Sequence, residues 1–408
     1  QNDVIGYNVY RQSKGHSAQK VNSKLVGQSH FTDTTVSPDN SYKYFVTAVN
    51  AALIEGKASA PVTTDVEVLS DDAFLEMVQR ASFEYFWREA DQFNGLMYDG
   101  TNNRVVSTAS IGFGLSAFLI AAERGYKSKS ALEARAYSIL KTLNHSKSKN
   151  GFLYHYHNSE GRPSLEAYEN VVSSIDSGLL LMGAITAGEY FGGRVQREAE
   201  ALVEKTNWHS FTDHQKKLIH MAWDPQDGGK YLPYTWDYYS DETIICALLG
   251  IAAPKKEHRL AAEYFYTWKR LYGTNKNERF VYSWPGALFT YQFAHCWIDF
   301  KKLGKDNPQK FGIDTPAVNW FENSRSATLS SRQYCLDRSA KNPTYGPDSW
   351  GLTASAVKSG YSVAGAQPRG EHGEGLGDGS IAPYAAGSSM TLTPQLSTKA
   401  LRHYYNLR

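Results

Sequence analysis

The pattern of apolar and polar positions changes once along the chain, near residue 65. Before that point, apolar and polar residues alternate in Gly6–Arg11, Phe31–Val36 and Tyr42–Asn50, and the Ser-Pro-Asp-Asn segment at 37–40 is typical of a turn. Alternation of this kind predicts β-strands. We therefore expect a small β module over residues 1–64 and a different domain over residues 65–408.

From Ser70 onward, apolar residues recur at spacings of three and four, which predicts helices. The first predicted helix begins at Ser70, where two acids follow a capping serine. The pattern places the others near residues 107–124, 129–145, 172–191, 194–206, 240–252, 257–272, 288–304, 316–338, 380–389 and 394–407.

The predicted helices alternate in character along the chain. The one at 107–124 is apolar or small on every side, as are those at 172–191, 240–252 and 288–304, whereas the helices between them carry Lys, Arg and Glu. A helix that is apolar all round is buried, and one with a charged face lies outside. The alternation therefore predicts an all-α domain in which an inner ring of helices is wrapped by an outer ring, an (α/α) toroid.

The composition of the chain excludes some classes of function and favours others. The 408 residues carry a formal net charge of +2, which argues against binding nucleic acid by neutralising phosphates. We find no apolar run long enough for a transmembrane helix. Nine Trp and 27 Tyr supply flat apolar rings with a polar edge, which suit sugar rings. The three cysteines are far apart in apolar patterns, and we expect them to be buried free thiols: Cys246, Cys296, Cys335.

Two acidic segments precede apolar helices. In the first, residues 166–176, Glu169 and Tyr168 precede the helix and Asp176 lies about one turn inside it. An acid in a buried helix is catalytic or a paired structural group, and both interpretations stay open for Asp176 and Glu169. In the second, residues 231–242, Tyr234 and Trp236 could bring a sugar beside Glu242.

Within that second segment, a capping role is the alternative for Glu242 and is our expectation for Asp237 and Asp241.

Two further segments add polar and aromatic candidates. Trp284 precedes a predicted inner helix on which Phe289, Gln292 and His295 recur at helical spacing; the alternative for His295 is a histidine of the core. We expect no metal, since no histidine pair has a ligand spacing with a nearby acid. Residues 345–386 hold a Gly-rich loop, with Asp378 as a possible helix cap, and these candidates: Trp350, Tyr361, Asp378, Tyr384.

Carboxylates beside aromatic rings are what glycoside hydrolysis requires, with one acid protonated and one ionised. Several motifs then make the chain from about residue 70 resemble the bacterial glycoamylase-like domain family. They include FEYFWREAD at 83–91, SSIDSGLLLMGAI at 173–185, YYSDETIICALLG at 238–250 and DGSIAPYAAGSS at 378–389. The resemblance implies an (α/α)6 barrel, here lacking its last helix, in an exported bacterial enzyme that is periplasmic or secreted.

The resemblance also implies an activity and a site. It implies inverting hydrolysis of β-1,2-glucan or sophoro-oligosaccharides, with Glu242 as the general acid, Asp176 or Asp378 assisting, and no cofactor. The family's loop carboxylates near the second inner helix correspond only approximately to Glu166 or Glu169. The alternatives are a glucoamylase-like hydrolase of α-glucan and a sugar-binding pseudoenzyme that lacks the catalytic base. We expect a monomer whose partner is a saccharide.

The first 64 residues resemble the back half of a fibronectin type III module. The resemblance lies in GYNVYR at 6–11, FTDTTV at 31–36 and YKYFVTAVN at 42–50, with Tyr42 or Tyr44 as a tyrosine corner. It implies a partial β-sandwich.

Overall fold

The computed structural model describes residues 3–27, 31–101, 103–164, 170–226, 228–358, 360–370 and 377–407. Their contacts divide the chain into two compact units, one running to Met77 and the other spanning Val78–Leu407. The division falls inside helix α1 (Asp71–Arg88), so this helix begins in one unit and continues into the other. It lies about a dozen residues after the change in sequence pattern.

The N-terminal unit contains one antiparallel sheet of four strands in the order β2-β1-β3-β4. Its long strands pair along most of their length, with Tyr10 opposite Phe45 and their rings stacked 5.1 Å apart. Tyr42 is buried, and its hydroxyl accepts a hydrogen bond from the Ser37 backbone N–H at 3.1 Å. The strands are β1 (Val4–Ser13), β2 (Gln19–Lys20), β3 (Ser41–Asn50) and β4 (Val62–Asp65).

The strand predicted at Phe31–Val36 is absent: the segment is a loop. Asp33 accepts hydrogen bonds from the N–H and the hydroxyl of Thr35, and its carboxylate also bonds Arg11 and Tyr44. A side chain that satisfies nearby donors in this way competes with strand pairing.

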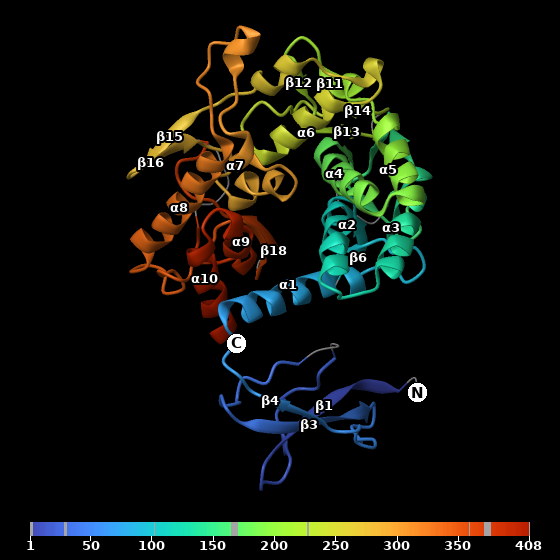
Figure 1. Ribbon diagram of the computed structural model, residues 1–408, viewed down its shortest axis with the longest axis vertical. Coiled ribbons are helices and arrows are strands. Elements are labelled where there is room, and N and C mark those ends of the chain that lie inside the picture. The colour runs from blue at the N-terminus through green and yellow to red at the C-terminus, as the bar shows by residue number, and fades with distance from the viewer. Residues whose placement is uncertain are drawn as a thin grey trace. The chain divides into compact units, whose positions relative to one another are not determined.

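The C-terminal unit is mainly helical. Its inner helices α2, α4 and α6 pack side by side in that order, and α3 and α5 cover α2 and α4 from outside (Figure 1). The helices are α1 (Asp71–Arg88), α2 (Thr108–Glu123), α3 (Lys129–Asn144), α4 (Ser174–Phe191), α5 (Gly193–Lys205), α6 (Asp241–Ala252), α7 (Phe300–Leu303), α8 (Trp320–Arg338), α9 (Pro383–Ser388) and α10 (Pro394–Asn406).

Glycines let α2 and α4 approach closely. A Cβ atom placed on Gly183 of α4 would lie 2.0 Å from the Gly112 carbonyl oxygen, and one on Gly112 of α2 would lie 2.1 Å from the Leu179 carbonyl oxygen. Only hydrogen atoms fit in those spaces, so the two backbones touch. The apolar, small-residue pattern of these helices thus produces the tightest helix pair of the unit.

Serine caps set where the inner helices begin. Ser107, Ser173 and Ser240 precede α2, α4 and α6, and each accepts a hydrogen bond from a backbone N–H of the first turn. At the other ends, Gly125 and Gly192 have φ of 68° and 67°, as the sequence predicts for residues that end helices.

Two predicted helices are wrong. Residues 257–272 form 3-10 turns (Lys256–His258 and Ala262–Tyr266) and the start of a strand, and residues 288–304 form two 3-10 turns followed by α7. Backbone groups in both stretches bond other segments: Lys269 N–H donates to the Asp237 carbonyl at 2.7 Å, and Ala294 N–H donates to the Asp241 carboxylate at 3.0 Å. An N–H used in this way is lost to a helix.

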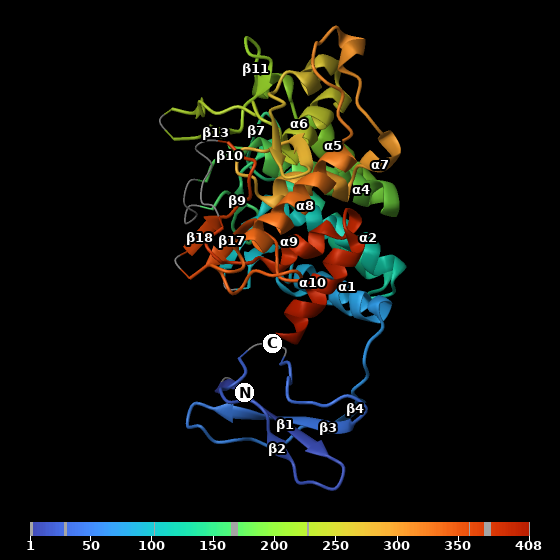
Figure 2. The ribbon, with the colours of Figure 1, turned by 90° about the vertical axis from the view of Figure 1, so that its left-hand side faces the viewer.

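Short strands precede the inner helices and gather on one side of the unit, at the left of Figure 2. Because β6 leads into α2 and β10 leads into α4, that side is where these helices begin. The strands form small antiparallel sheets, among them β5-β6-β9 and β10-β13-β14. They are β5 (Tyr98–Gly100), β6 (Asn103–Ser107), β7 (Ser148–Lys149), β8 (Phe152–Leu153), β9 (Tyr156–His157), β10 (Val172–Ser173), β11 (Thr212–Asp213), β12 (Leu218–Ile219), β13 (Ala222–Asp224), β14 (Lys230–Tyr231), β15 (Tyr272–Asn275), β16 (Glu278–Val281), β17 (Ala354–Val357) and β18 (Gly360–Val363).

The cysteines only partly follow the sequence prediction. Cys246 and Cys335 are buried free thiols, but Cys296 is exposed, because the predicted inner helix around it is a pair of 3-10 turns. Among the helices that the structure describes, none is both long enough and apolar enough to cross a membrane.

Candidate active site

Two of the predicted acids come together where α4 and α6 begin. Asp176 lies in the first turn of α4 and Glu242 in the first turn of α6. The helices pack closely because Gly178 faces α6: a Cβ atom there would lie 3.3 Å from Ile245 and 3.8 Å from the Cys246 sulfur. The two carboxylates are near enough for the charge of Asp176 to raise the pKa of Glu242.

Glu242 has the properties of a general acid. Its carboxylate accepts a hydrogen bond from the Ser240 hydroxyl at 3.1 Å, and its backbone N–H donates to the Ser240 hydroxyl oxygen at 3.2 Å. Burial, aided by Asp176 and opposed by the Ser240 hydrogen bond, raises the pKa of Glu242 to about 7. A carboxyl group with such a pKa holds a proton near neutral pH and can donate it.

The neighbouring Asp241, expected from the sequence to cap the helix, is not the N-cap of α6, which is Ser240. The Asp241 side chain is fully buried and accepts hydrogen bonds from the Tyr239 hydroxyl at 3.1 Å and the Ala294 N–H at 3.0 Å. Burial raises the pKa of Asp241 to about 8. The group therefore ties α6 to the 3-10 turn at Ala294. Asp237, for which a capping role was also expected, pairs with Lys269 at 3.1 Å.

Three residues that the sequence analysis did not single out also face Asp176. His155 lies 3.5 Å from the Asp176 carboxylate and stacks on Tyr156 with ring centroids 3.8 Å apart. Partial burial and the charge of Asp176 raise the pKa of Asp99, and His155 lowers it. Burial, followed by the charges of Asp99 and Asp176, raises the pKa of Tyr156 to about 12. Asp99 and Glu242 share one sequence signal, an acid shortly before or at the start of an apolar helix.

Trp236 lies beside this group but is partly built into the core. Its indole N–H donates to the Ser174 hydroxyl at 2.9 Å, and Ser174 in turn donates to the Met221 carbonyl at 2.9 Å. The ring is half-buried and packs against the main hydrophobic core. Only one part of the indole is therefore available to a sugar, and the residue also fixes the loop to the start of α4.

Trp284 and Tyr234 offer more exposed rings. Trp284 is 37% exposed and meets Tyr238 edge-on with centroids 5.2 Å apart. The Trp284 ring covers Gly370, where a Cβ atom would lie 2.5 Å from it. Tyr238 lies four residues before Glu242, in the segment that leads into α6. Tyr234 is 64% exposed on the loop between β14 and α6.

Three aromatic candidates come from later segments. Tyr361 on β18 is exposed, and it approaches Tyr156 closely enough to influence the pKa of that phenol. Phe289 and Tyr384 meet at Thr353: the Phe289 N–H and the Tyr384 hydroxyl both donate to the Thr353 hydroxyl, each at 3.2 Å. The structure thus brings Tyr361 near Tyr156, and it joins the Phe289 backbone and the Tyr384 hydroxyl at Thr353.

Two predicted binding residues are buried, and a third is half-buried. Trp350 is fully buried, so it cannot stack on a sugar. Gln292 is also buried and donates to the Ser389 hydroxyl at 2.7 Å. His295 packs edge-on against Phe300, and burial lowers its pKa to about 4. The predictions for these residues assumed a continuous inner helix or an open loop, and neither forms.

The remaining candidates are an exposed acid and two residues outside the described part of the chain. Asp378 is exposed and accepts a hydrogen bond from the Ser380 N–H at 2.8 Å, which lowers its pKa. It closes a turn and does not cap α9, whose N-cap is Ala382. Glu169 and Tyr168 lie outside the residues that the structure describes.

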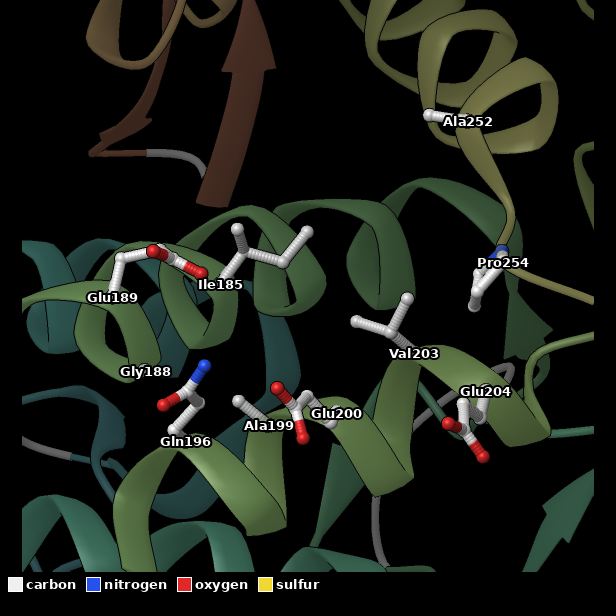
Figure 3. Close-up of a pocket in the computed structure, with 10 residues that line it drawn as sticks. All are labelled: Ile185, Gly188, Glu189, Gln196, Ala199, Glu200, Val203, Glu204, Ala252 and Pro254. Carbon is white, nitrogen blue, oxygen red and sulfur yellow. The ribbon is translucent and has the colours of Figure 1, made fainter. Parts of the chain in front are cut away.

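A pocket of about 350 Å³ lies on the other side of the same helices (Figure 3). It is lined by the second half of α4, by α5 and by the end of α6, including Ile185, Glu200 and Pro254. No aromatic side chain lines it, and the carboxylates of the site lie at the opposite ends of α4 and α6. This pocket is therefore not where we place the chemistry.

Within the described ranges, no three His, Cys, Asp or Glu side chains are arranged to hold a metal ion.

Comparisons with known proteins show similarity to a family model over part of the chain and to solved structures of the same fold. The family model Glycoamylase, described as "Putative glucoamylase", matches residues 233–408. The chain is 27% identical to the exo β-1,2-glucooligosaccharide sophorohydrolase (non-reducing end) of Parabacteroides distasonis, over 99% of this chain and 58% of that protein.

Among solved structures, a β-1,2-glucanase from Parabacteroides distasonis matches 99% of this chain and 60% of its own, with a TM-score of 0.86 and 23% identity. An endo-β-1,2-glucanase from Chitinophaga pinensis, in complex with sophorotriose and glucose, matches 83% of each chain, with a TM-score of 0.71 and 24% identity.

The chain therefore spans about three fifths of the length of the Parabacteroides relatives and is similar to them throughout its own length. Residues 233–408 match the glycoamylase family model, and the fold is similar to that of the β-1,2-glucanase structures.

Proposed function

We propose that this chain is an inverting glycoside hydrolase that cleaves β-1,2-glucan or sophoro-oligosaccharides. The observation that carries the proposal is the pair of carboxyl groups where α4 and α6 begin. Glu242, whose pKa burial raises to about 7, supplies a proton, and Asp176 lies on the adjacent helix as the second carboxyl group. Two carboxyl groups of different protonation state are the requirement for hydrolysing a glycosidic bond.

The reaction follows from these roles. Glu242 donates its proton to the glycosidic oxygen as the bond from that oxygen to the anomeric carbon breaks. Asp176, ionised, accepts a proton from the water that attacks the anomeric carbon from the opposite face. Inversion requires the two groups to be roughly 6.5–9.5 Å apart, so that the water fits between them. Asp378 and Glu169 remain further candidates for assisting carboxylates.

The sugar is held by rings around these acids. Trp284, Tyr234 and Tyr361 are exposed, and Trp236 lies against Ser174 at the start of α4. An aromatic face packs against the C–H face of a sugar, and its polar edge bonds the hydroxyls.

The substrate comes from the named relatives. The sophorohydrolase and both β-1,2-glucanases act on β-1,2-linked glucose, and the similarity to the first covers 99% of this chain. The glycoamylase-like match at 233–408 includes Glu242 and Trp284.

We extend the proposal to the architecture and location. The alternation of buried α2, α4 and α6 with outer α3 and α5 supports an (α/α)6 barrel over residues 65–408. The hydrogen bond from Ser37 to Tyr42 supports a fibronectin type III-like module over residues 1–64. Because a glucan polymer does not cross a membrane, we place the protein in the periplasm or outside the cell. We expect a monomer, which light scattering would check.

Product analysis tests the function. The protein is incubated with β-1,2-glucan, β-1,3-glucan and starch, and the products are separated by chromatography. We expect sophorose-type oligosaccharides from the first polymer alone. Glucose release from starch would replace the proposal with a glucoamylase-like activity, the alternative favoured by the description of the matching family model. Binding of β-1,2-glucan without products would indicate a pseudoenzyme.

A substitution tests the acid. Glu242→Gln removes the proton and keeps the shape of the side chain, so we expect kcat to fall by at least ~10²-fold with little change in stability. Glu322→Gln is the matched control, because Glu322 also lies in the first turn of a helix but is exposed. Normal turnover in the Glu242 variant would remove that residue from the mechanism.

The same residue predicts an alkaline limit. Because Glu242 must be protonated and its pKa is about 7, the activity of the wild-type protein falls as the pH rises through about 7. A pH profile of kcat/KM checks this, and a rate that stays flat to pH 9 would contradict it.

A further inference from the structure

The backbone of Tyr156, which the proposed mechanism does not use, is fixed by its neighbours. Strand β9 pairs with β6, and Tyr156 lies opposite Ser107, the serine that caps α2. The Asn170 side chain bonds both backbone groups of the tyrosine: its amide oxygen accepts from the Tyr156 N–H at 3.0 Å, and its amide nitrogen donates to the Tyr156 carbonyl at 2.9 Å. The Ser164 N–H donates to the same carbonyl at 3.1 Å. These bonds set the direction in which the side chain leaves the strand.

The ring of Tyr156 is packed beside a proposed catalytic group. The residue is half-buried, and its ring stacks on the imidazole of His155 with centroids 3.8 Å apart and 17° between the planes. The imidazole Nε2 lies 3.5 Å from the Asp176 carboxylate. The stack therefore holds the phenol near Asp176.

Acidic groups from three other elements act on the phenol. They are Asp99 of β5, Asp176 of α4 and Tyr361 of β18. Burial first, and then these groups, raise the pKa of Tyr156 to about 12. The hydroxyl is therefore protonated at neutral pH, and a protonated phenol can donate one hydrogen bond.

The Tyr156 hydroxyl has no hydrogen-bond partner among the residues that the structure describes, and the bonds of this residue are those of its backbone. Tyr85, which is also half-buried and interacts with Asp99, differs in this respect, since its hydroxyl donates to the Tyr98 carbonyl at 2.9 Å. Partly buried polar groups usually find a partner. A fixed donor that is left open beside two carboxylates is therefore suited to a ligand.

We propose that Tyr156 is a substrate-binding residue, whose hydroxyl donates a hydrogen bond to a hydroxyl oxygen of the glucan beside Asp176. This inference rests on the proposed function, which brings a glucan to that carboxyl group. The stack on His155 and the bonds from Asn170 hold the donor before the sugar arrives, so little conformational freedom is lost on binding. Trp284 and Tyr234 would offer ring faces to the sugar, whereas Tyr156 uses its polar edge.

The first experiment compares Tyr156→Phe with wild type on β-1,2-glucan. The substitution removes only the hydroxyl group, so the ring and its stack on His155 stay. We expect kcat/KM to fall by about fivefold to tenfold, which is the size of effect that losing one hydrogen bond produces. Because the hydroxyl bonds no other described residue, the midpoint of thermal unfolding should stay within about 1 °C of the wild-type value.

Tyr137→Phe is the matched control. Tyr137 is also half-buried, but it lies on α3, where the Arg194 guanidinium carbon is 4.4 Å from the centre of its ring. We expect this variant to keep the wild-type kcat/KM. An unchanged kcat/KM in Tyr156→Phe would overturn the proposal. A loss of activity that came with a lower melting temperature would also overturn it, since it would show a packing role.

A second experiment measures binding without turnover. Glu242→Gln and the double variant Glu242→Gln/Tyr156→Phe are each titrated with sophorotriose by calorimetry. We expect Kd to be about fivefold to tenfold higher for the double variant. If the wild-type protein hydrolyses no glucan but the two Kd values differ in this way, the proposed function fails and the role of Tyr156 stands. Equal Kd values, or no binding to either protein, would overturn that role whatever the wild-type activity.

Discussion

The two halves of the helical unit obey the sequence pattern to very different degrees. From α2 to α6, each predicted helix forms within about three residues of its expected bounds. Between residues 253 and 319, the same kind of spacing gives 3-10 turns, a two-stranded sheet and the four-residue α7. The difference teaches that apolar spacing predicts which face is buried, and that backbone partners decide whether the segment is a helix.

In the regular half, the helices need little from outside. Serines cap α2, α3, α4 and α6, and the close contact of α2 with α4 is made by backbone at Gly112 and Gly183. In the irregular half, neighbours supply the partners. Asp241 takes the Ala294 N–H, and Leu288 N–H donates to the Leu352 carbonyl. A buried carboxylate competing for an N–H is not visible in the local pattern of residues 288–304.

The largest effect is expected where the regular half is tightest. In Gly183→Ala, the new Cβ would lie 2.0 Å from the Gly112 carbonyl oxygen, so α2 and α4 must separate. We expect the free energy of unfolding to fall by about 3 kcal/mol, measured by urea denaturation. The control is Gly346→Ala, where the nearest atom to the new Cβ lies 4.0 Å away. Equal stability of the two variants would show that the contact is not tight.

The next effect concerns the acid that organises the irregular half. The pKa of Asp241 is about 8 in the folded protein and about 4 when unfolded, so the folded state holds a proton between those values that the unfolded state has released. The stability that Asp241 contributes is thus complete below about pH 4 and is lost as the pH rises through about 8.

Asp241→Asn removes this titration. Relative to the variant, the wild-type protein should lose more than about 1 kcal/mol of stability between pH 5 and pH 8, measured by urea denaturation at each pH. Asp314→Asn changes the same chemical group at an exposed position and serves as the control. Parallel stability curves for wild type and the Asp241 variant would contradict the buried, protonated state.

The smallest effects on stability are expected at the helix caps. One cap from each half of the helical unit allows the two halves to be compared directly. Ser128 caps the 16-residue α3, and Asp299 caps the four-residue α7. We expect Ser128→Ala to lower the free energy of unfolding by about 1 kcal/mol. We expect Asp299→Ala to lower it by about half of that, because less helix depends on the second cap. Thermal melts of the two variants measure this. A larger loss at Asp299 would mean that α7 stabilises more of the irregular half than its length indicates.

The candidate site was predictable only in part. The sequence identified Asp176 and Glu242 from acids at the start of apolar helices, and it identified Trp284 and Tyr361 from aromatic loops. It missed His155 and the stacking of its ring on Tyr156. It also assigned Trp350 and Gln292 to substrate binding, although both are buried, and it left a core role open for His295, which is half-buried.

The sequence by itself determined the helical class, the serine caps, the buried faces of α2, α4 and α6, and the chemistry of acids next to aromatic rings. Each of these depends on residues a few positions apart, where local physics decides. Only the tertiary structure decided which acids meet and which segments lose their helices. The pKa of Glu242 is raised mainly by burial and to a lesser extent by Asp176 on the neighbouring α4. The Ala294 N–H is taken by the Asp241 carboxylate, 53 positions away along the chain. The pKa of a carboxyl group depends on the burial and the charges around it, and the residues that provide them come from distant parts of the sequence.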